Sequence, residues 1–178
     1  MNSFSATTIL MVRRDGKTCM ASDGQVTFNN TVIKASANKV KRAGKGQVLV
    51  GFAGGAADGL ALYSRFEAKL DEFQGNLERA VVELAKDWRT DRVLRQLQAQ
   101  MIVADTQKSF LVSGNGDLMH PDADGILAIG SGANFSMAAD RALVDHTEIP
   151  AVENFRQAMK IAADISVFTQ PQLPLEEL

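Results

Sequence analysis

The sequence predicts an α+β fold in which two antiparallel sheets are stacked face to face and a layer of helices covers the outside of each sheet. Two observations lead to this prediction. Strand patterns are followed by two helical patterns, and the same order repeats in the second half of the chain. Several strands, Val48–Val50 among them, are apolar at consecutive positions, which indicates that they are covered on both faces. The 178 residues contain no linker, repeat or low-complexity segment, so a single domain is expected.

The first third of the chain is predicted to form three β-hairpins. β-branched residues open the first strand, and segments typical of tight turns separate the strands of each pair. The expected strand pairs are Thr7–Arg14 with Lys17–Ser22, Val26–Phe28 with Thr31–Ile33, and Lys39–Arg42 with Gln47–Phe52. Their turns are Asp15-Gly16, Asn29-Asn30 and Ala43-Gly44-Lys45-Gly46.

Two helices follow the hairpins. Apolar residues recur at helical spacing from Leu62 to Phe73 and again from Leu77 to Trp88. Gly75-Asn76 separates the two segments and supplies a cap.

The second half repeats this order. Strands are expected at Gln100–Asp105, Ser109–Ser113 and Gly125–Gly130, with a turn at Gly114-Asn115-Gly116-Asp117, and helices at Asn134–Asp145 and Val152–Ile161. The tail, Gln170–Leu178, contains two prolines and is expected to be irregular.

Composition excludes several classes of protein. The chain is 46% hydrophobic and 22% charged, which is typical of a globular domain rather than a disordered one. Its net charge is −2 with bases and acids interspersed, so no nucleic-acid partner is expected. No apolar stretch approaches the roughly 18 residues of a membrane span, and the first residues do not resemble a signal peptide. The single cysteine, Cys19, suits a reducing compartment, so we expect a soluble cytoplasmic protein.

The common catalytic motifs are missing. Without a Gly-x-x-x-x-Gly-Lys-Ser/Thr loop the chain is not expected to hydrolyse ATP itself. His120 and His146, the two histidines, are expected at the surface, which argues against a Ser-His-Asp triad. Cys19 lies within a strand and is expected to be a small buried hydrophobe. No His, Cys and carboxylate cluster has metal-ligand spacing, and no organic cofactor is expected.

Thr7, at the start of the first strand, is the candidate nucleophile. A threonine hydroxyl needs a base to accept its proton, and an α-amine, with a pKa of about 7.7–8.0, can act as that base. Cleavage of the peptide bond before Thr7 would put both groups on one residue. Taken alone, Ala6-Thr7-Thr8 is weak evidence, because β-branched residues that merely open a strand are the commoner explanation of such a pair.

Other residues are candidates to assist Thr7 in catalysis. Lys39 could stabilise its alkoxide, and Asp23 could keep that lysine charged; alternatively, Asp23 is a turn residue and Lys39 a solvated strand residue. The glycines of Gly51–Gly55 could bring backbone N–H groups to an oxyanion, or could serve close strand–helix packing. Ser131 could hydrogen-bond the Thr7 amine, although Gly130-Ser131-Gly132 is also compatible with a phosphate-binding turn.

Six segments in this order resemble the HslV (ClpQ) family, peptidase subunits of bacterial HslUV proteases and relatives of proteasome β subunits. The resemblance extends from Thr7 nearly to the C-terminus, and its most specific part surrounds Trp88. The segments are Thr7-Thr8-Ile9, Ser22-Asp23-Gly24-Gln25, Lys39-Val40-Lys41-Arg42, Gly51-Phe52-Ala53-Gly54-Gly55, Glu83–Arg92 and Ala128-Ile129-Gly130-Ser131-Gly132.

The resemblance implies the N-terminal nucleophile hydrolase fold, a four-layer αββα sandwich, and a threonine peptidase. Thr7 would be nucleophile and base, Asp23 and Lys39 would tune it, Gly54 would donate to the oxyanion, and Ser131 would assist at the amine. It also implies a homo-oligomer of two stacked hexameric rings that degrades unfolded proteins delivered by the HslU (ClpY) ATPase hexamer.

The resemblance further implies a structural monovalent cation, which by analogy with the family is sodium. It would be bound by the backbone carbonyls of Ala163, Ser166 and Thr169. Here alanine and serine replace the commoner glycine and cysteine, and alanine disfavours positive φ. Residues 1–6 would be a propeptide that is removed, leaving residues 7–178 as one peptidase domain. Two alternatives are a free-standing amidohydrolase of small molecules and a catalytically silent ring scaffold.

Overall fold

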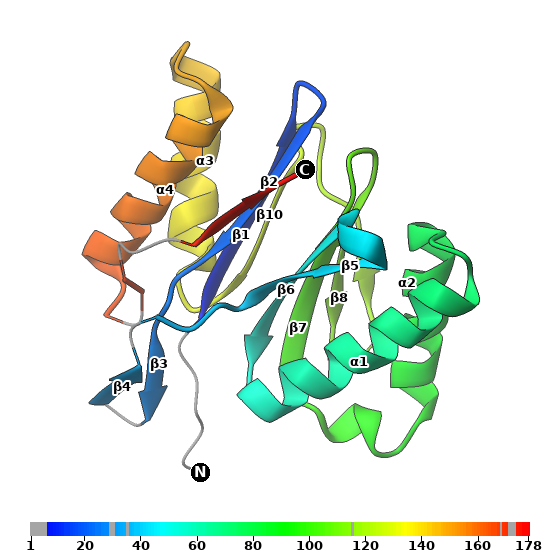
Figure 1. The fold of residues 1–178 in the computed structure, drawn as a ribbon. Coiled ribbons are helices and arrows are strands. Elements are labelled where there is room, and N and C mark those ends of the chain that lie inside the picture. Colours follow the sequence, from blue (N-terminus) through cyan, green and yellow to red (C-terminus); the bar gives the residue numbers. More distant parts are fainter. Residues whose placement is uncertain (1–6, 29–30, 35, 115, 168, 171–173) are drawn as a thin grey trace.

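The computed structural model describes residues 7–28, 31–34, 36–114, 116–167, 169–170 and 174–178. Two antiparallel sheets lie face to face between two pairs of helices (Figure 1). This arrangement confirms the predicted sandwich with a helical layer outside each sheet. The predicted propeptide, residues 1–6, lies outside the described residues, as do Asn29 and Asn30 of one predicted turn and Asn115 of another.

The first sheet has the strand order β10-β1-β2-β11. Its strands are β1 (Thr8–Arg14), β2 (Lys17–Ser22), β10 (Ile126–Gly130) and β11 (Leu175–Glu177). β1 and β2 form the predicted hairpin, in which Ile9 lies opposite Ser22 and Arg14 opposite Lys17. On its other side β1 pairs with β10, so that Thr8 lies opposite Gly130. This register brings two segments distant in sequence together at the opening of β1.

The second sheet has the order β5-β6-β7-β8-β9, and a separate two-stranded sheet holds β3 and β4. The strands are β3 (Val26–Phe28), β4 (Thr31–Lys34), β5 (Val40–Ala43), β6 (Val48–Gly54), β7 (Ala99–Ala104), β8 (Ser109–Ser113) and β9 (Leu118–Met119). A 3-10 turn, Gly44–Gly46, connects β5 to β6 where a hairpin turn was predicted. β9 was not predicted, because two residues carry no readable period.

The four predicted helices are present. They are α1 (Ala56–Glu72), α2 (Leu77–Thr90), α3 (Ala133–His146) and α4 (Ala151–Ile165), and a 3-10 turn, Leu94–Gln96, follows α2. The predicted cap is also present, since the Asn76 side chain accepts a hydrogen bond from the Arg79 N–H at 3.1 Å. Within the described residues, no helix is long and apolar enough to cross a membrane.

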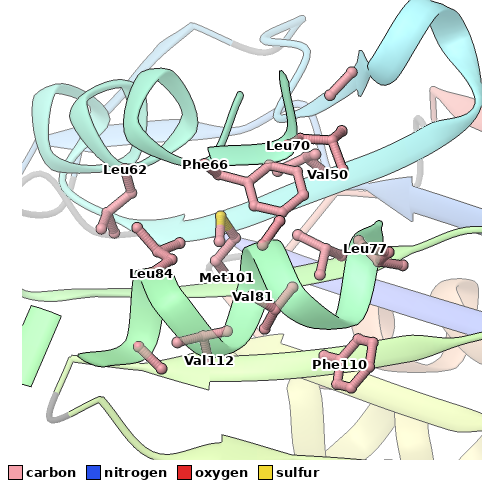
Figure 2. Close-up of a cluster of buried hydrophobic side chains, with 14 of the residues drawn as sticks. Val50, Leu62, Phe66, Leu70, Leu77, Val81, Leu84, Met101, Phe110 and Val112 are labelled. Carbon is pink, nitrogen blue, oxygen red and sulfur yellow. The ribbon is translucent and has the colours of Figure 1, made fainter. Parts of the chain in front are cut away.

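The core has three layers. Figure 2 shows the layer between α1, α2 and the second sheet, where Phe66, Leu70 and Leu84 pack against Val50, Met101 and Val112. The two other layers divide the side chains of β1. Ile9 and Met11 face the second sheet, whereas Leu10 and Val12 face α3 and α4. This alternation explains why β1 is apolar at consecutive positions.

One carboxylate lies within the buried face of α3. Asp140 is 0% exposed, and neither of its carboxylate oxygens has a hydrogen-bond partner within the described part of the chain. Burial raises the pKa of Asp140 to about 6; Asp124 adds to this effect and Arg14 opposes it. Asp140 is therefore an ionisable group on a buried helix face whose other buried residues, Ala133 and Ser136, are uncharged.

The tail corrects the sequence prediction. Gln170–Leu178 was expected to be irregular, but Leu175–Glu177 forms β11 and pairs with β2. The strand is held from the other sheet, because the Arg42 guanidinium donates to Glu176 Oε2 and to the Glu177 carbonyl oxygen, each at 2.8 Å. A strand of three residues held by such distant contacts leaves no local signal in the sequence.

Candidate active site

Thr7 lies at the entrance to β1, where the segment after β10 holds its backbone. The Thr7 carbonyl oxygen accepts a hydrogen bond from the Ser131 N–H at 2.8 Å and one from the Ser131 hydroxyl at 3.5 Å. Gly130 has a φ of 93°, and a Cβ atom there would lie 1.8 Å from this oxygen, so only glycine fits. The predicted Gly130-Ser131 segment therefore fixes the position of Thr7.

Asp23 follows β2 and is 0% exposed. Its Oδ1 accepts hydrogen bonds from the Thr8 N–H at 2.6 Å and from Lys39 Nζ at 3.3 Å, and its Oδ2 accepts one from the Gln25 N–H at 3.2 Å. The Asp23 N–H donates in turn to the Thr8 carbonyl oxygen at 3.0 Å. These charge-assisted bonds fix both the backbone next to Thr7 and the amine of Lys39.

Lys39 precedes β5 and is 7% exposed. Its Nζ donates to Asp23 and to the Gln25 carbonyl oxygen. Burial lowers the pKa of Lys39 against the opposing effect of Asp23, and burial raises the pKa of Asp23 against the opposing effect of Lys39. Perturbed pKa values of this kind are common at functional sites.

Gly54 ends β6, directly before α1. Its φ is 119°, and a Cβ atom there would lie 2.2 Å from the Gln98 carbonyl oxygen, so close packing against β7 already requires glycine. Its neighbour Ala53 lies near the nucleophile, because a Cβ atom on Gly130 would be 3.4 Å from the Ala53 side chain. The structure therefore brings the end of β6 beside Thr7, and the oxyanion role of Gly54 stays a prediction.

Two hydroxyl groups complete the surroundings of Thr7, and no local sequence pattern predicts their contact. Thr8 Oγ1 lies 2.8 Å from Thr169 Oγ1 and accepts a hydrogen bond from the Gly132 N–H at 3.0 Å. Gly132 is the N-cap of α3, and a Cβ atom there would lie 2.3 Å from Thr8 Oγ1 and 2.6 Å from Thr169 Oγ1. Both threonines are buried. The hydroxyl pair thus joins the segment after α4 to the strand that Thr7 opens.

The residues predicted to hold a cation lie at the C-terminal end of α4. Ala163 belongs to the last turn of the helix and Ser166 is its C-cap, with the Thr169 N–H donating to the Ser166 carbonyl oxygen at 3.1 Å. Ala163 is not among the described residues with positive φ, so alanine is unstrained there. The last carbonyls of a helix carry the negative end of its dipole, which suits a cation.

The remaining titratable candidates lie elsewhere. Cys19 is buried in β2, and burial raises the pKa of its thiol, which does not favour a nucleophile. His120 contacts the ring of Phe110, with ring centroids 4.6 Å apart and the ring planes tilted by 55°, and His146 ends α3. Both histidines are exposed, as expected. Within the described residues, no cluster of three or more His, Cys, Asp or Glu side chains could hold a metal ion.

Comparisons with known proteins identify the family of the chain. Residues 3–177 match the proteasome subunit family. The chain is 51% identical over 175 residues to the ATP-dependent protease subunit HslV of Pseudothermotoga lettingae. The aligned segment covers 98% of this chain and 99% of that protein.

Solved structures give the same result. The crystal structure of a eukaryotic HslV from Trypanosoma brucei superimposes with a TM-score of 0.91 at 45% identity and covers 96% of this chain and 98% of the other. Thiobacillus denitrificans BPH, solved in complex with epoxomicin, has the same fold with a TM-score of 0.76 at 21% identity, covering 96% of this chain and 97% of that one.

Proposed function

The chain belongs to the proteasome family and to its HslV subunits, and on this premise we propose that Thr7, exposed by loss of residues 1–6, is the nucleophile of a threonine endopeptidase. The protein is the peptidase subunit of an ATP-dependent protease. The observation that carries the assignment is the buried pair of Asp23 and Lys39, which holds the backbone of Thr8 next to the nucleophile.

The reaction uses the α-amine of Thr7 as its base. The Thr7 hydroxyl oxygen attacks the carbonyl carbon of the substrate peptide while its proton passes to the amine. The peptide C–N bond then breaks, the amine returns the proton to the leaving nitrogen, and an acyl-enzyme ester remains. Water attacks this ester, again with the amine as base, and releases the second product with restoration of the Thr7 hydroxyl.

Lys39 and Asp23 set the electrostatics of this step. A cationic Lys39 stabilises negative charge on the Thr7 oxygen and disfavours permanent protonation of the nearby amine. Asp23 keeps the lysine charged in spite of its burial. The backbone N–H of Gly54 donates to the oxyanion of the tetrahedral intermediate, and Ser131 assists at the amine through its hydroxyl.

The active peptidase is an assembly of several copies of the chain. Copies of the chain form two stacked hexameric rings around a chamber, and an HslU ATPase hexamer in the cytoplasm delivers unfolded proteins to it. The name of the Pseudothermotoga lettingae relative, an ATP-dependent protease subunit, supports an ATPase partner. Because only unfolded chain enters such a chamber, folded proteins are protected from the peptidase.

A monovalent cation completes the proposed site. The carbonyl groups of Ala163, Ser166 and Thr169 would hold it at the C-terminal end of α4, and sodium suits such oxygen ligands. When bound, the ion supplies a fixed positive charge that orders this segment. The Thr169 hydroxyl then holds the Thr8 side chain in place.

The test combines intact mass with activity. Purified protein should lack residues 1–6 and hydrolyse a fluorogenic peptide in the presence of the ATPase. Thr7→Ala should abolish hydrolysis with the native mass of the ring unchanged, and Thr7→Ser should retain some activity. A full-length chain that is fully active would contradict the free-amine mechanism.

The same measurements separate the alternatives. A stable monomer that hydrolyses small amides would favour a free-standing amidohydrolase. A processed ring without peptidase activity, with or without the ATPase, would favour a silent scaffold.

A further inference from the structure

A polar pocket of about 220 Å³ lies at the end of the sandwich remote from Thr7. The turn between β1 and β2 and the loop between β7 and β8 lie at this end, the upper one in Figure 1. Arg13 and Ser109 are among its lining residues. Arg13 is six residues along the extended chain from Thr7, which corresponds to about 20 Å. The pocket is therefore separate from the candidate active site.

The floor of the pocket continues the core between the two sheets. On β1, Ile9 and Met11 face the second sheet, and Arg13 follows on the same face. On β8, Leu111 belongs to the same core, and Ser109 precedes it on the same face. The apolar layer thus ends in two polar side chains that face each other across the sandwich.

Both floor residues present hydrogen-bond donors without an acceptor. Within the described residues, neither Arg13 Nε nor Ser109 Oγ has a partner, although both atoms are shut off from solvent. Ser109 is 1% exposed. The next arginine along β1, Arg14, pairs with Asp15 at 3.7 Å, whereas no ion pair of Arg13 occurs in the described part of the chain. Buried donors and unpaired charges of this kind are unfavourable unless something binds them.

The rim of the pocket carries two basic side chains and one acid. Lys108 and His120 line it together with a single acid, Glu78. Glu78 is already engaged, because Lys108 Nζ donates to its Oε2. Lys108, through its hydrogen bond and charge, and His120 more weakly, hold the pKa of Glu78 below its usual value. The one acid is thus offset by Lys108, and among the residues that the structure describes the charge of Arg13 has no counterpart.

We propose that this pocket binds a small tetrahedral oxyanion, a phosphate or sulfate group, with the Arg13 guanidinium and the Ser109 hydroxyl as its innermost ligands. An oxyanion in the pocket neutralises the unpaired arginine, and a small movement of the Arg13 and Ser109 side chains toward the pocket lets it accept from both orphaned donors. A cation would be repelled by Arg13, and an apolar ligand would leave the donors unsatisfied. Sites for drug-sized ligands span roughly 300–1,000 Å³, so a cavity of this size favours an ion or the phosphate end of a small molecule.

The experiment measures phosphate binding to the assembled protein. Inorganic phosphate is titrated calorimetrically and by thermal unfolding, with chloride at equal ionic strength as reference. Wild-type protein should bind phosphate saturably, with a rise in Tm. Arg13→Gln and Ser109→Ala should each weaken binding, the first by roughly tenfold or more. The matched control is Arg14→Gln, which removes one positive charge from the next position on β1, whose side chain faces the opposite side.

Each result of the phosphate titration either supports or overturns the proposed site. Loss of binding in Arg13→Gln and Ser109→Ala with binding retained in Arg14→Gln supports the site. Tighter binding of free phosphoserine than of inorganic phosphate would point to a phosphorylated small molecule, and the reverse to the free ion. A response that does not saturate, or that is equal in Arg13→Gln and wild type, would mean an adventitious ion only and would overturn the proposal. Because Arg13→Gln removes a half-buried unpaired charge, it should fold, and Ser109→Ala provides an independent second variant.

Discussion

The hydroxyl oxygens of Thr8 and Thr169 lie 2.8 Å apart, although 161 positions separate the two residues in the chain. The Gly132 N–H also donates a hydrogen bond to Thr8 Oγ1. Three distant segments, the opening of β1, the start of α3 and the segment after α4, therefore meet at one hydroxyl group. This contact places the predicted cation segment next to the residue that follows the nucleophile.

Replacing Thr169 by valine should lower kcat roughly tenfold with little change in KM, because a buried hydroxyl that loses its partner costs about 1–3 kcal/mol and the opening of β1 loses one support. Thr169→Ser keeps the hydroxyl and should restore most of the activity. Steady-state peptide hydrolysis measures both effects. Thr90→Val, which removes an exposed hydroxyl at the end of α2, is the control and should behave as wild type. Equal activity of Thr169→Val and Thr90→Val would remove the positioning role.

Replacing Asp23 by asparagine should shift the pH profile of the peptidase. Burial lowers the pKa of Lys39, and Asp23 opposes this, so without the carboxylate the pKa of Lys39 falls further. The lysine then loses its proton at lower pH, and the alkaline limit of kcat/KM should move to lower pH. The measurement is kcat/KM as a function of pH. Asp71→Asn, an exposed position in α1, should leave the profile unchanged, and an unshifted profile in Asp23→Asn would contradict the role of Lys39.

Replacing Asp140 by asparagine should stabilise the fold at neutral pH. The folded-state pKa of about 6 lies above the ordinary 3.8, so the favourable contribution of the protonated group is complete below 3.8 and is lost as pH rises through 6. At pH 7 and above the wild-type carboxylate is ionised in a buried position, at a cost of about 3 kcal/mol in the free energy of unfolding. Asp140→Asn should therefore unfold at higher temperature than wild type at neutral pH, with a smaller difference at acid pH.

Asp145→Asn is the matched control for this effect, since Asp145 lies exposed near the end of the same helix. It should leave the pH dependence of Tm as in wild type. A wild-type Tm that is constant over the acid-to-neutral range would argue against an ionisable Asp140.

Replacing Arg42 by alanine should loosen the C-terminal strand. Arg42 binds Glu176 and the Glu177 carbonyl oxygen, but the ion pair is partly exposed, so the free energy of unfolding should fall by at most about 1 kcal/mol. The amides of β11 should nevertheless exchange their hydrogens faster, because the strand opens locally. Hydrogen-exchange mass spectrometry of residues 174–178 measures this. Arg65→Ala, which removes the distant pair with Asp91, should leave that exchange unchanged.

Regular elements could be predicted from the sequence because their signals are local. Helical spacing from Leu62 to Trp88 and the turn at Asp15-Gly16 depend on neighbours a few residues apart. The structure places Thr7, Asp23 and Lys39 together as the resemblance implied, while their catalytic roles stay predictions.

The features that were not predicted depend on distant partners. The Thr8–Thr169 contact, the pairing of β11 with β2 and the anchoring of β11 by Arg42 all join remote parts of the chain. Asp140 was missed for another reason: an aspartate in a helix normally indicates a solvated face, and here it lies in the buried one.

β11 also protects the molecule from its own copies. Without it, the outer side of β2 would present unpaired N–H and C=O groups, and such a bare edge is a template on which another chain can add a strand. The strand covers this edge over three residue pairs, and Glu177 forms an ion pair with Lys17 at its end. A chain shortened by these few residues should consequently be prone to self-association through β2, even though it keeps every residue proposed for catalysis.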